Sequence, residues 1–319
     1  MTLFDDNSLL QPDPEPTSQS AEASGPRALA PSPAPSEPQL LGDPISFAAA
    51  APPVAPSHSS KPSLPEDLRI TWSWLHFIFF LFFGAASLIV VQAGFAIYYT
   101  PLHRFSNEQD FERFVLSKPA FAVGSMVVWY ALIFLFLYVT LSVLRGSPFW
   151  QTLGWRNLTH RTPGWPGNPL IYLLAGLTLS VAVFLATAKM QPPQNVPIEE
   201  LFRYKNTALL FMGMAVFVAP LVEETVFRGY LYPLLAKSFG VATGVIVTGV
   251  LFGLMHGAQL GWTWGLVSVL IVVGIIFTFV RARTGSVFAS FLLHLGYNSM
   301  IAVVTILGTK GFTKMPSAN

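Results

Sequence analysis

Long apolar segments recur along the chain from Trp72 onward. They lie at about residues 72–99, 119–144, 169–188, 207–222, 240–257, 262–280 and 284–308. Each approaches the roughly 20 residues that a helix needs to cross a bilayer. The fourth segment is short, but its helix is expected to continue through a charged stretch to about Lys237. The pattern predicts an all-α, polytopic membrane bundle of about seven transmembrane helices, within a range of roughly six to eight.

Residues 1–65 have a different character. They hold 14 of the 26 prolines, mixed with Ser and Ala. Such sequences favour extended, polyproline-like chain and bury too little apolar surface to form a core. We therefore expect residues 1–65 to form a disordered tail, with a docking segment as the alternative. The start of the chain is acidic at Asp5 and Asp6, whereas a signal peptide begins with basic residues.

Composition and charge agree with a membrane location. Hydrophobic residues make up 52% of the chain and charged residues only 11%, whereas soluble domains are nearer one quarter charged. Cys is absent, which excludes disulfides, Cys-ligated zinc, iron–sulfur clusters and thiol catalysis. A net charge of +2 is too small to indicate a nucleic-acid partner. We expect a multi-pass protein of the cell membrane, in contact with the lipid bilayer.

Basic residues between the apolar segments do not fix the orientation, because eight lie on each side. Arg145 after the second segment, and Arg281 with Arg283 after the sixth, favour an N-terminus on the inner side.

Two adjacent acids stand out, because a charge inside a membrane is costly and usually serves a function. After Glu200 the rest of the chain contains only Glu223 and Glu224 as acids. Arg228 follows Glu224 by four positions, so the two share a helix face in the favourable order. Glu223 points about 100° away from Glu224 and has no partner of this kind. The alternative for Glu224 and Arg228 is an ion pair at a helix end, at the membrane surface.

Further polar side chains lie in later apolar helices. His256 ends one apolar run, and His294 and Asn298 share a face of another. The chain contains no HExxH or GxSxG motif, and no Asp follows Asp110. A carboxylate in a low-dielectric site can act as general base toward water, an imidazole can share that water, and an amide with a second imidazole can donate to an oxyanion. The same Glu and two His could instead hold a divalent metal ion.

The motifs, taken in order, resemble one family. Residues 223–228 read EExxxR, residues 252–256 read FxxxH and residues 294–298 read HxxxN. On successive late helices these resemble the CPBP family of intramembrane endopeptidases, which includes CAAX proteases, bacteriocin-processing enzymes and Abi proteins. Residues 148–156 also resemble the loop before the family's core. The resemblance covers about residues 145–308.

The resemblance implies roles for single residues. Glu223 would be the general base, His256 would help to bind the attacking water, and His294 with Asn298 would stabilise the oxyanion. Supporting roles would fall to Glu224, Arg228 and Phe252. Members are described both as metalloproteases and as metal-free glutamate enzymes, so a divalent ion, most simply Zn²⁺, would be held by Glu223, His256 and His294.

The expected organisation follows from this core. The domains would be the tail at 1–65, two transmembrane helices at 66–144, the protease core at 145–308 and a short tail at 309–319. The substrate would be a peptide or protein associated with the membrane, of the CAAX type or another. The alternatives are a proton-coupled transporter and a non-catalytic family member that acts as scaffold or immunity protein.

The mechanism makes a demand on the fold. Squarely crossing, opposed fourth and fifth helices would place Glu223 and His256 at opposite faces of the membrane. We expect the fourth helix to extend to Lys237, and the fifth to be tilted or to start later than about residue 240. The four polar groups would then converge on one water-accessible cavity. Glu223 and His256 would lie within about 8 Å, the reach of one bridging water.

Overall fold

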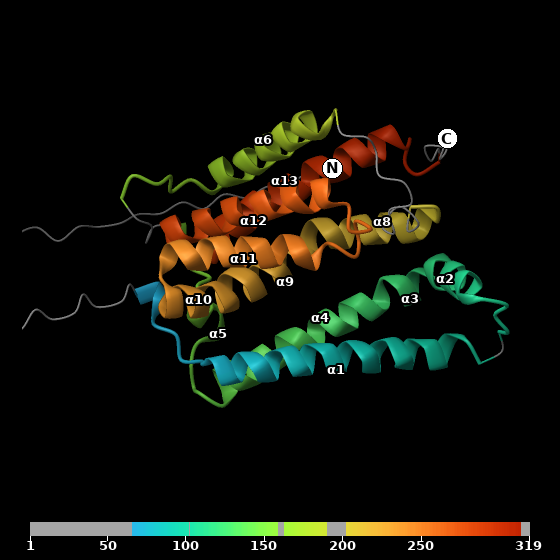
Figure 1. Cartoon of the computed structure of the whole chain (residues 1–319), viewed down its shortest axis with the longest axis horizontal. Helices are drawn as coiled ribbons and strands as arrows, with labels where there is room; N and C mark the ends of the chain where they lie inside the picture. Colours follow the sequence, from blue (N-terminus) through green and yellow to red (C-terminus); the bar gives the residue numbers. More distant parts are fainter. Residues whose placement is uncertain (1–65, 102, 159–162, 190–201, 314–319) are drawn as a thin grey trace, which may run out of the picture. The chain divides into compact units, whose positions relative to one another are not determined.

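The computed structural model describes residues 66–101, 103–158, 163–189 and 202–313, and within these ranges it contains helices and no strand (Figure 1). The predicted tail at 1–65 and the end of the chain at 314–319 lie outside the described part. The first half comprises η1 (Glu66–Leu68), α1 (Trp74–Tyr99), α2 (Glu108–Ser117), α3 (Pro119–Ala122), α4 (Gly124–Leu137), η2 (Tyr138–Val143), α5 (Phe149–Thr152) and α6 (Pro169–Thr187). The second half comprises α8 (Lys205–Gly213), η4 (Met214–Val218), α9 (Ala219–Glu223), η5 (Glu224–Leu231), α10 (Tyr232–Phe239), α11 (Val241–Met255), α12 (Trp264–Thr284) and α13 (Val287–Gly308).

Six of the seven predicted segments are long and apolar enough to cross a membrane. They are Trp74–Tyr99, Pro119–Val143, Pro169–Thr187, Lys205–Phe239, Trp264–Thr284 and Val287–Gly308. The seventh, α11, is apolar but has only 15 residues, or about 22 Å at 1.5 Å per residue, against a hydrocarbon core of about 30 Å. The all-α membrane fold is therefore confirmed, and the chain is an integral, multi-pass membrane protein.

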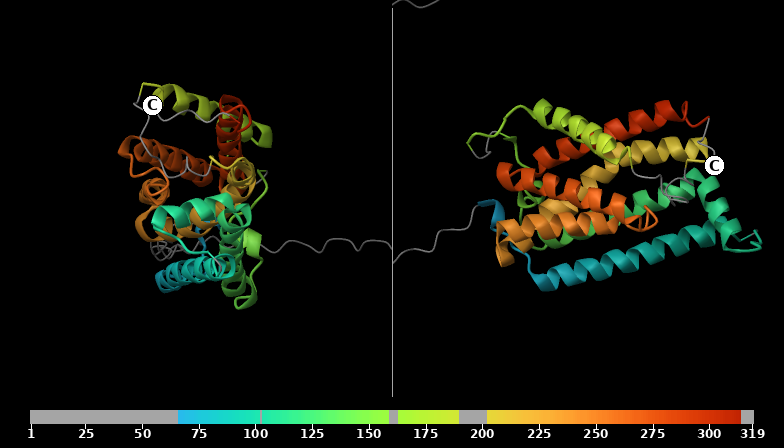
Figure 2. Two further views of the ribbon diagram at one scale, coloured as in Figure 1. Left: turned by 90° about the vertical axis from the view of Figure 1, so that its right-hand side faces the viewer. Right: turned by 45° about the horizontal axis from the view of Figure 1, so that its top comes forward.

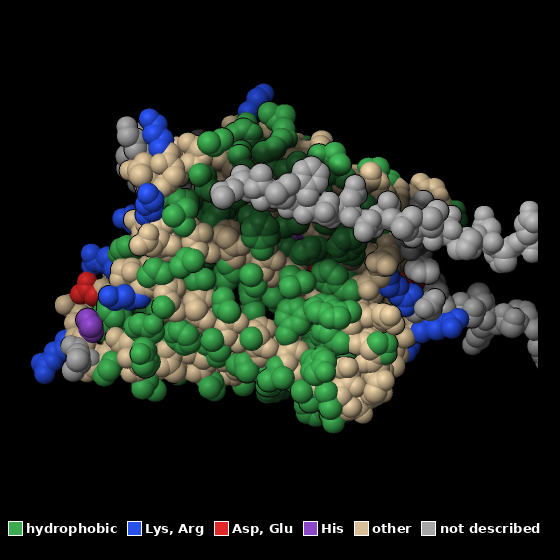
Figure 3. Space-filling view, turned by 180° about the vertical axis from the view of Figure 1, so that it is seen from behind, with side chains coloured by type: hydrophobic (Ala, Val, Ile, Leu, Met, Phe, Trp, Pro, Cys, Tyr) green, Lys and Arg blue, Asp and Glu red, His purple; other side chains and the backbone are tan. Residues whose placement is uncertain are grey.

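The surface has the distribution that a bilayer requires. Hydrophobic side chains cover the middle of the face in Figure 3, and charged side chains gather toward its two ends. We call these the α5 end (residues 145–158, 239–241 and 284–287) and the α2 end (residues 103–118, 202–205 and 308–313). The α5 end lies at the left of Figure 1 and the α2 end at the right. Figure 2 shows the same helices from two further directions.

Close packing of α6 on α13 depends on two glycines. A Cβ on Gly176 would lie 2.0 Å from the carbonyl oxygen of Leu293, and one on Gly296 would lie 2.1 Å from that of Leu173. Because only glycine permits this approach, the two backbones lie in direct contact. This contact fixes α13, which carries His294.

The fourth span is not a uniform α-helix. Its α turns are interrupted by two π-helical stretches, η4 and η5. In each case a proline is the second residue after the stretch, Pro220 after η4 and Pro233 after η5. Proline has no N–H and its ring crowds the carbonyl four residues earlier, so the hydrogen-bond register widens before it. Glu223 ends the short α segment between the two widened stretches, and Glu224 begins the second.

The segment before the core packs on η5. Leu153 is fully buried, and a Cβ on Gly229 would come within 2.7 Å of its carbonyl oxygen. The Trp155 indole donates to the Thr225 hydroxyl at 3.2 Å. These contacts hold the helix that carries both glutamates from the α5 side.

Candidate active site

Glu223 and His256 meet because they are nearly equidistant from one turn. The number of residues from Glu223 to Gly240 is nearly equal to the number from Gly240 to His256. Since α10 and α11 pack side by side from this turn, residues at equal distance from it lie at the same depth. The Glu223 Oε2 to His256 Nε2 distance is 4.0 Å, so the predicted proximity is confirmed.

Only part of the expected reason for this proximity is right. The fourth span does continue past Glu223, to Phe239. However, α11 begins at Val241, so the alternative of a later start for the fifth helix is wrong. The helix instead stops short, and His256 is its C-cap residue.

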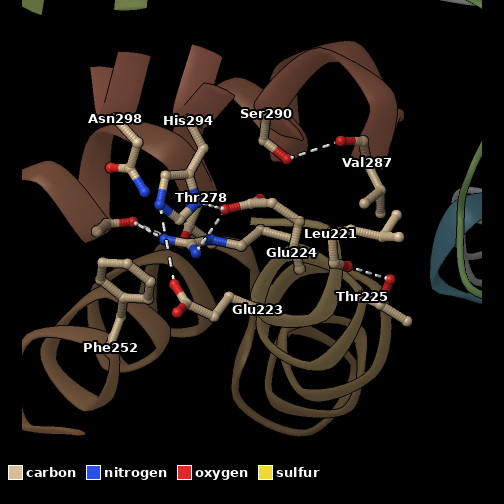
Figure 4. Close-up of polar contacts among 12 residues, drawn as sticks. Leu221, Glu223, Glu224, Thr225, Phe252, Thr278, Val287, Ser290, His294 and Asn298 are labelled. Atoms are coloured by element: carbon tan, nitrogen blue, oxygen red, sulfur yellow. Dashed lines mark hydrogen bonds and ion pairs between the residues drawn. The ribbon is translucent and has the colours of Figure 1, made fainter. Parts of the chain in front are cut away.

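His294 approaches Glu223 from the other side. Its Nε2 lies 3.8 Å from Glu223 Oε2, as Figure 4 shows for the pair, and His256 lies 4.0 Å from the same oxygen, so the carboxylate lies between two imidazoles. The side chains of Glu223 and His256 are 18% and 22% exposed, whereas that of His294 is 4% exposed. Water can therefore reach Glu223 and His256, and His294 closes the inner side.

Hydrogen bonds fix which ring nitrogens face Glu223. His256 Nδ1 lies 2.8 Å from the carbonyl oxygen of Phe252, an acceptor left free near the end of α11. His294 Nδ1 lies 3.0 Å from Glu224 Oε1. Because a carbonyl or carboxylate oxygen only accepts, both Nδ1 atoms carry protons, and both rings present Nε2 toward Glu223.

Glu224 and Arg228 form a buried ion pair. Their side chains are both 0% exposed, and Arg228 Nη1 lies 2.8 Å from Glu224 Oε1. The remaining guanidinium donors reach α12, with Nε bonded to the Thr278 hydroxyl at 3.2 Å and Nη2 to the Gly274 carbonyl at 2.9 Å. The alternative of a surface pair at a helix end is therefore wrong, because the pair ties η5, α12 and α13 together inside the protein.

Phe252 fills the space between the charged groups. Its ring lies 4.4 Å from the Arg228 guanidinium, 4.7 Å from the His256 ring and 5.7 Å from the His294 ring. An aromatic face attracts the guanidinium and excludes water from the pair. Phe252 therefore orients both imidazoles by packing.

Asn298 has a structural bond that the sequence did not predict. Its Nδ2 donates to the carbonyl oxygen of Ala215 at 2.8 Å. In the widened register of η4, the N–H of Ala219 bonds to the carbonyl of Met214, so the next donor would be residue 220. Pro220 has no N–H, and Asn298 supplies the donor instead. One N–H of the amide is thus used, and the second is left for the cavity.

The predicted residues converge on one cavity of about 370 Å³. Glu223, His256, His294 and Asn298 all line it, which confirms the expected convergence. Its other walls are mostly aromatic, Met and aliphatic side chains. It reaches toward the α2 end, where Thr187, Phe202 and Thr305 line it.

The donors partly match a metal site. Two Nε2 atoms and a carboxylate face one another, and each Nδ1–H is held by an oxygen, as in histidine metal sites. Within the described ranges, however, no group of three or more His, Cys, Asp or Glu side chains is arranged to hold a metal ion. In this arrangement the three side chains therefore do not fit a metal.

Several residues around the site were not predicted. Thr278 and Gly274 hold Arg228, and Phe277 packs 4.7 Å from the His294 ring. Tyr130 and Gln259 line the cavity. Spacing gave no signal for the α12 residues, because they meet Arg228 across 46 to 50 positions of sequence. Tyr130 stands out in the sequence only as a polar side chain in an apolar segment, which does not say that it faces the cavity.

Comparison with known proteins agrees with this geometry. The family model described as "Type II CAAX prenyl endopeptidase Rce1-like" matches residues 205–300, which carry all three motifs. No curated protein and no solved structure matches the chain. Because the matched family is a protease family, the match supports endopeptidase activity of the CAAX type. The match at residues 205–300 to an Rce1-like type II CAAX prenyl endopeptidase domain is consistent with the CPBP and CAAX protease family that the three motifs resemble.

Proposed function

We propose that this protein is an intramembrane endopeptidase that hydrolyses a peptide bond of a membrane-associated, CAAX-like substrate. One observation carries the proposal. The Glu223 carboxylate lies 4.0 Å from His256 Nε2 and 3.8 Å from His294 Nε2, in a cavity within the membrane-spanning bundle.

Glu223 would act as general base. A water between Glu223 and His256 gives one proton to the carboxylate and directs its other hydrogen to the Nε2 lone pair of His256. The water oxygen then bonds to the peptide carbonyl carbon. When the carbon–nitrogen bond breaks, Glu223 returns the proton to the leaving amine.

Asn298 and His294 would stabilise the negative oxygen of the tetrahedral intermediate. Asn298 retains one Nδ2–H beyond the Ala215 bond. His294 would donate from Nε2 when both ring nitrogens carry protons, with its Nδ1–H held by the Glu224 carboxylate. Arg228 holds the Glu224 carboxylate in place through their 2.8 Å contact.

A metal-dependent mechanism is the second candidate. It is favoured by the two Nε2 atoms that face Glu223, with each Nδ1–H already bonded to an oxygen. A divalent ion such as Zn²⁺ would activate water and polarise the carbonyl. Since the three side chains do not fit a metal in this arrangement, we derive no step through it.

Cleavage of peptides by purified protein in detergent tests the proposal. We expect mass spectrometry to detect cleavage of a peptide library, including CAAX-type C-termini, by wild type and by Glu112→Gln, an exposed control on α2. Glu223→Gln should be inactive while keeping its apparent Tm. A chelator that abolishes cleavage, with recovery on adding Zn²⁺, would favour the metal mechanism. Absence of cleavage together with proton uptake by proteoliposomes would favour the transporter and contradict a peptidase.

A further inference from the structure

Tyr130 brings a polar group into the cavity from outside the matched domain. It lies on α4, well before the match begins at residue 205, the first residue of α8. The ring packs against a cluster formed by Val123, Phe211 and Met214, and the side chain lines the same cavity as Glu223. Tyr130 and Glu223 are close enough for an electrostatic interaction.

Other polar side chains on α4 have partners within the protein. The Trp129 indole donates to the Gly84 carbonyl at 2.9 Å, and the Ser125 hydroxyl accepts from Gln92 at 3.4 Å. Both bonds tie α4 to α1. By contrast, the Tyr130 hydroxyl makes no hydrogen bond with any residue of the described part of the chain. A tyrosine hydroxyl in a largely apolar setting usually finds a partner, and the space beside this one is the cavity.

Helices α4 and α13 thus border the place where a peptide would lie, because α4 carries Tyr130 and α13 carries Asn298. Asn298 reaches Ala215 of η4 from α13, and Ala215 packs against the same cluster as Tyr130. A neutral tyrosine hydroxyl can donate one hydrogen bond to an acceptor that enters the cavity. A bound peptide offers carbonyl oxygens as acceptors along its whole backbone.

We propose that the Tyr130 hydroxyl donates a hydrogen bond to a backbone carbonyl oxygen of the bound peptide, beside the scissile bond. Helix α4 thereby contributes a substrate-binding residue to the site within residues 205–300. This inference rests on the proposed peptidase function and adds to it how the substrate is held.

Removing the hydroxyl alone tests the proposal. Tyr130→Phe should raise KM about three- to tenfold and leave kcat within about twofold, because one neutral hydrogen bond to the ground state is lost. Tyr138→Phe, an exposed tyrosine beyond the end of α4 and outside the cavity, should match wild type. A fluorescently labelled peptide should not be cleaved by the Glu223→Gln variant, so its binding can be measured directly. In that variant, adding Tyr130→Phe should raise the Kd of the peptide by the same factor as the KM.

The outcomes separate this inference from the function on which it rests. If wild type cleaves and Tyr130→Phe binds the peptide as tightly as wild type, only the inference is wrong. A fall in kcat with unchanged peptide affinity would also overturn it, because the hydroxyl would then act on the reaction and not on binding. If wild type cleaves no peptide, the proposed peptidase function and the inference about Tyr130 are both contradicted.

Discussion

Glu223 and Glu224 are neighbours in sequence but have different surroundings. The carboxylate of Glu224 is fully buried, and its Oε1 accepts from both Arg228 and His294. Glu223 faces the cavity and two imidazoles. The separation of the two roles follows from the sequence, because adjacent residues on a helix point about 100° apart. The burial of the ion pair does not, because it depends on Thr278 and Gly274, which lie far away in sequence.

Breaking this buried pair should destabilise the protein. Glu224→Gln leaves the Arg228 charge without a counter-ion, at a cost of about 3–5 kcal/mol. We expect a clear fall in the apparent Tm in detergent. Asp110→Asn is the matched control, because the Asp110–Arg113 pair is exposed and worth at most about 1 kcal/mol. Equal apparent Tm values for the two variants would contradict the buried role of Glu224.

The fourth span shows how an element can differ from its sequence pattern. Apolar periodicity indicated a helix that continues past Glu223, and the helix does extend to Phe239. The two π-helical stretches were not predicted, because periodicity reports which positions are apolar and not the hydrogen-bond register. Pro220 and Pro233 were the local signal for them.

Restoring the missing N–H should disturb the site without weakening the helix. In Pro220→Ala the new N–H can bond to the Ala215 carbonyl and displace Asn298. We expect kcat to fall on the order of tenfold to a hundredfold, as for a misplaced catalytic group, with an apparent Tm no lower than that of wild type. Pro169→Ala, at the first turn of α6 where proline is tolerated, is the control. An unchanged kcat in Pro220→Ala would show that the Asn298–Ala215 bond has no part in catalysis.

The glycine contact between α6 and α13 gives a second prediction at this scale. In Gly176→Ala the new Cβ would lie 2.0 Å from the Leu293 carbonyl oxygen, so the helices must separate and the apparent Tm should fall. In Gly94→Ala nothing lies within 4 Å of the new Cβ, and the better helix propensity of Ala should hold or raise the Tm. Equal stability of the two variants would refute the close contact.

Across the whole molecule, the sequence predicted the places of the apolar helices, six of which are long enough to span a membrane, but not how the first ones serve the site. Apolar side chains on α1 and α4 identify a helix without saying which face meets the core, so the place of Tyr130 in the cavity could not be foreseen. Orientation was equally open, because the basic residues divide evenly. The cavity reaches toward the α2 end, which leads to a test of substrate access.

The absence of Cys makes cysteine labelling direct. We expect a membrane-impermeant maleimide to modify Thr305→Cys, in the cavity, from the same side of sealed vesicles as Thr313→Cys at the α2 end. Ser147→Cys, at the α5 end, should react from the opposite side. If the N-terminus lies on the inner side of the membrane, the maleimide should not reach Ser147→Cys in intact cells. Labelling of Thr305→Cys from the Ser147 side would contradict access from the α2 end.

The central claim is that Glu223 and His256 act on one water. A double-mutant cycle on kcat/KM with Glu223→Gln and His256→Ala tests it most directly, with His103→Ala, an exposed loop residue, as the control. We expect Glu223→Gln to lose about 10²–10⁴-fold, and the double variant to lose little more, because groups that act as a unit are not additive. If the two losses instead multiply, Glu223 and His256 act independently and the shared-water mechanism is wrong.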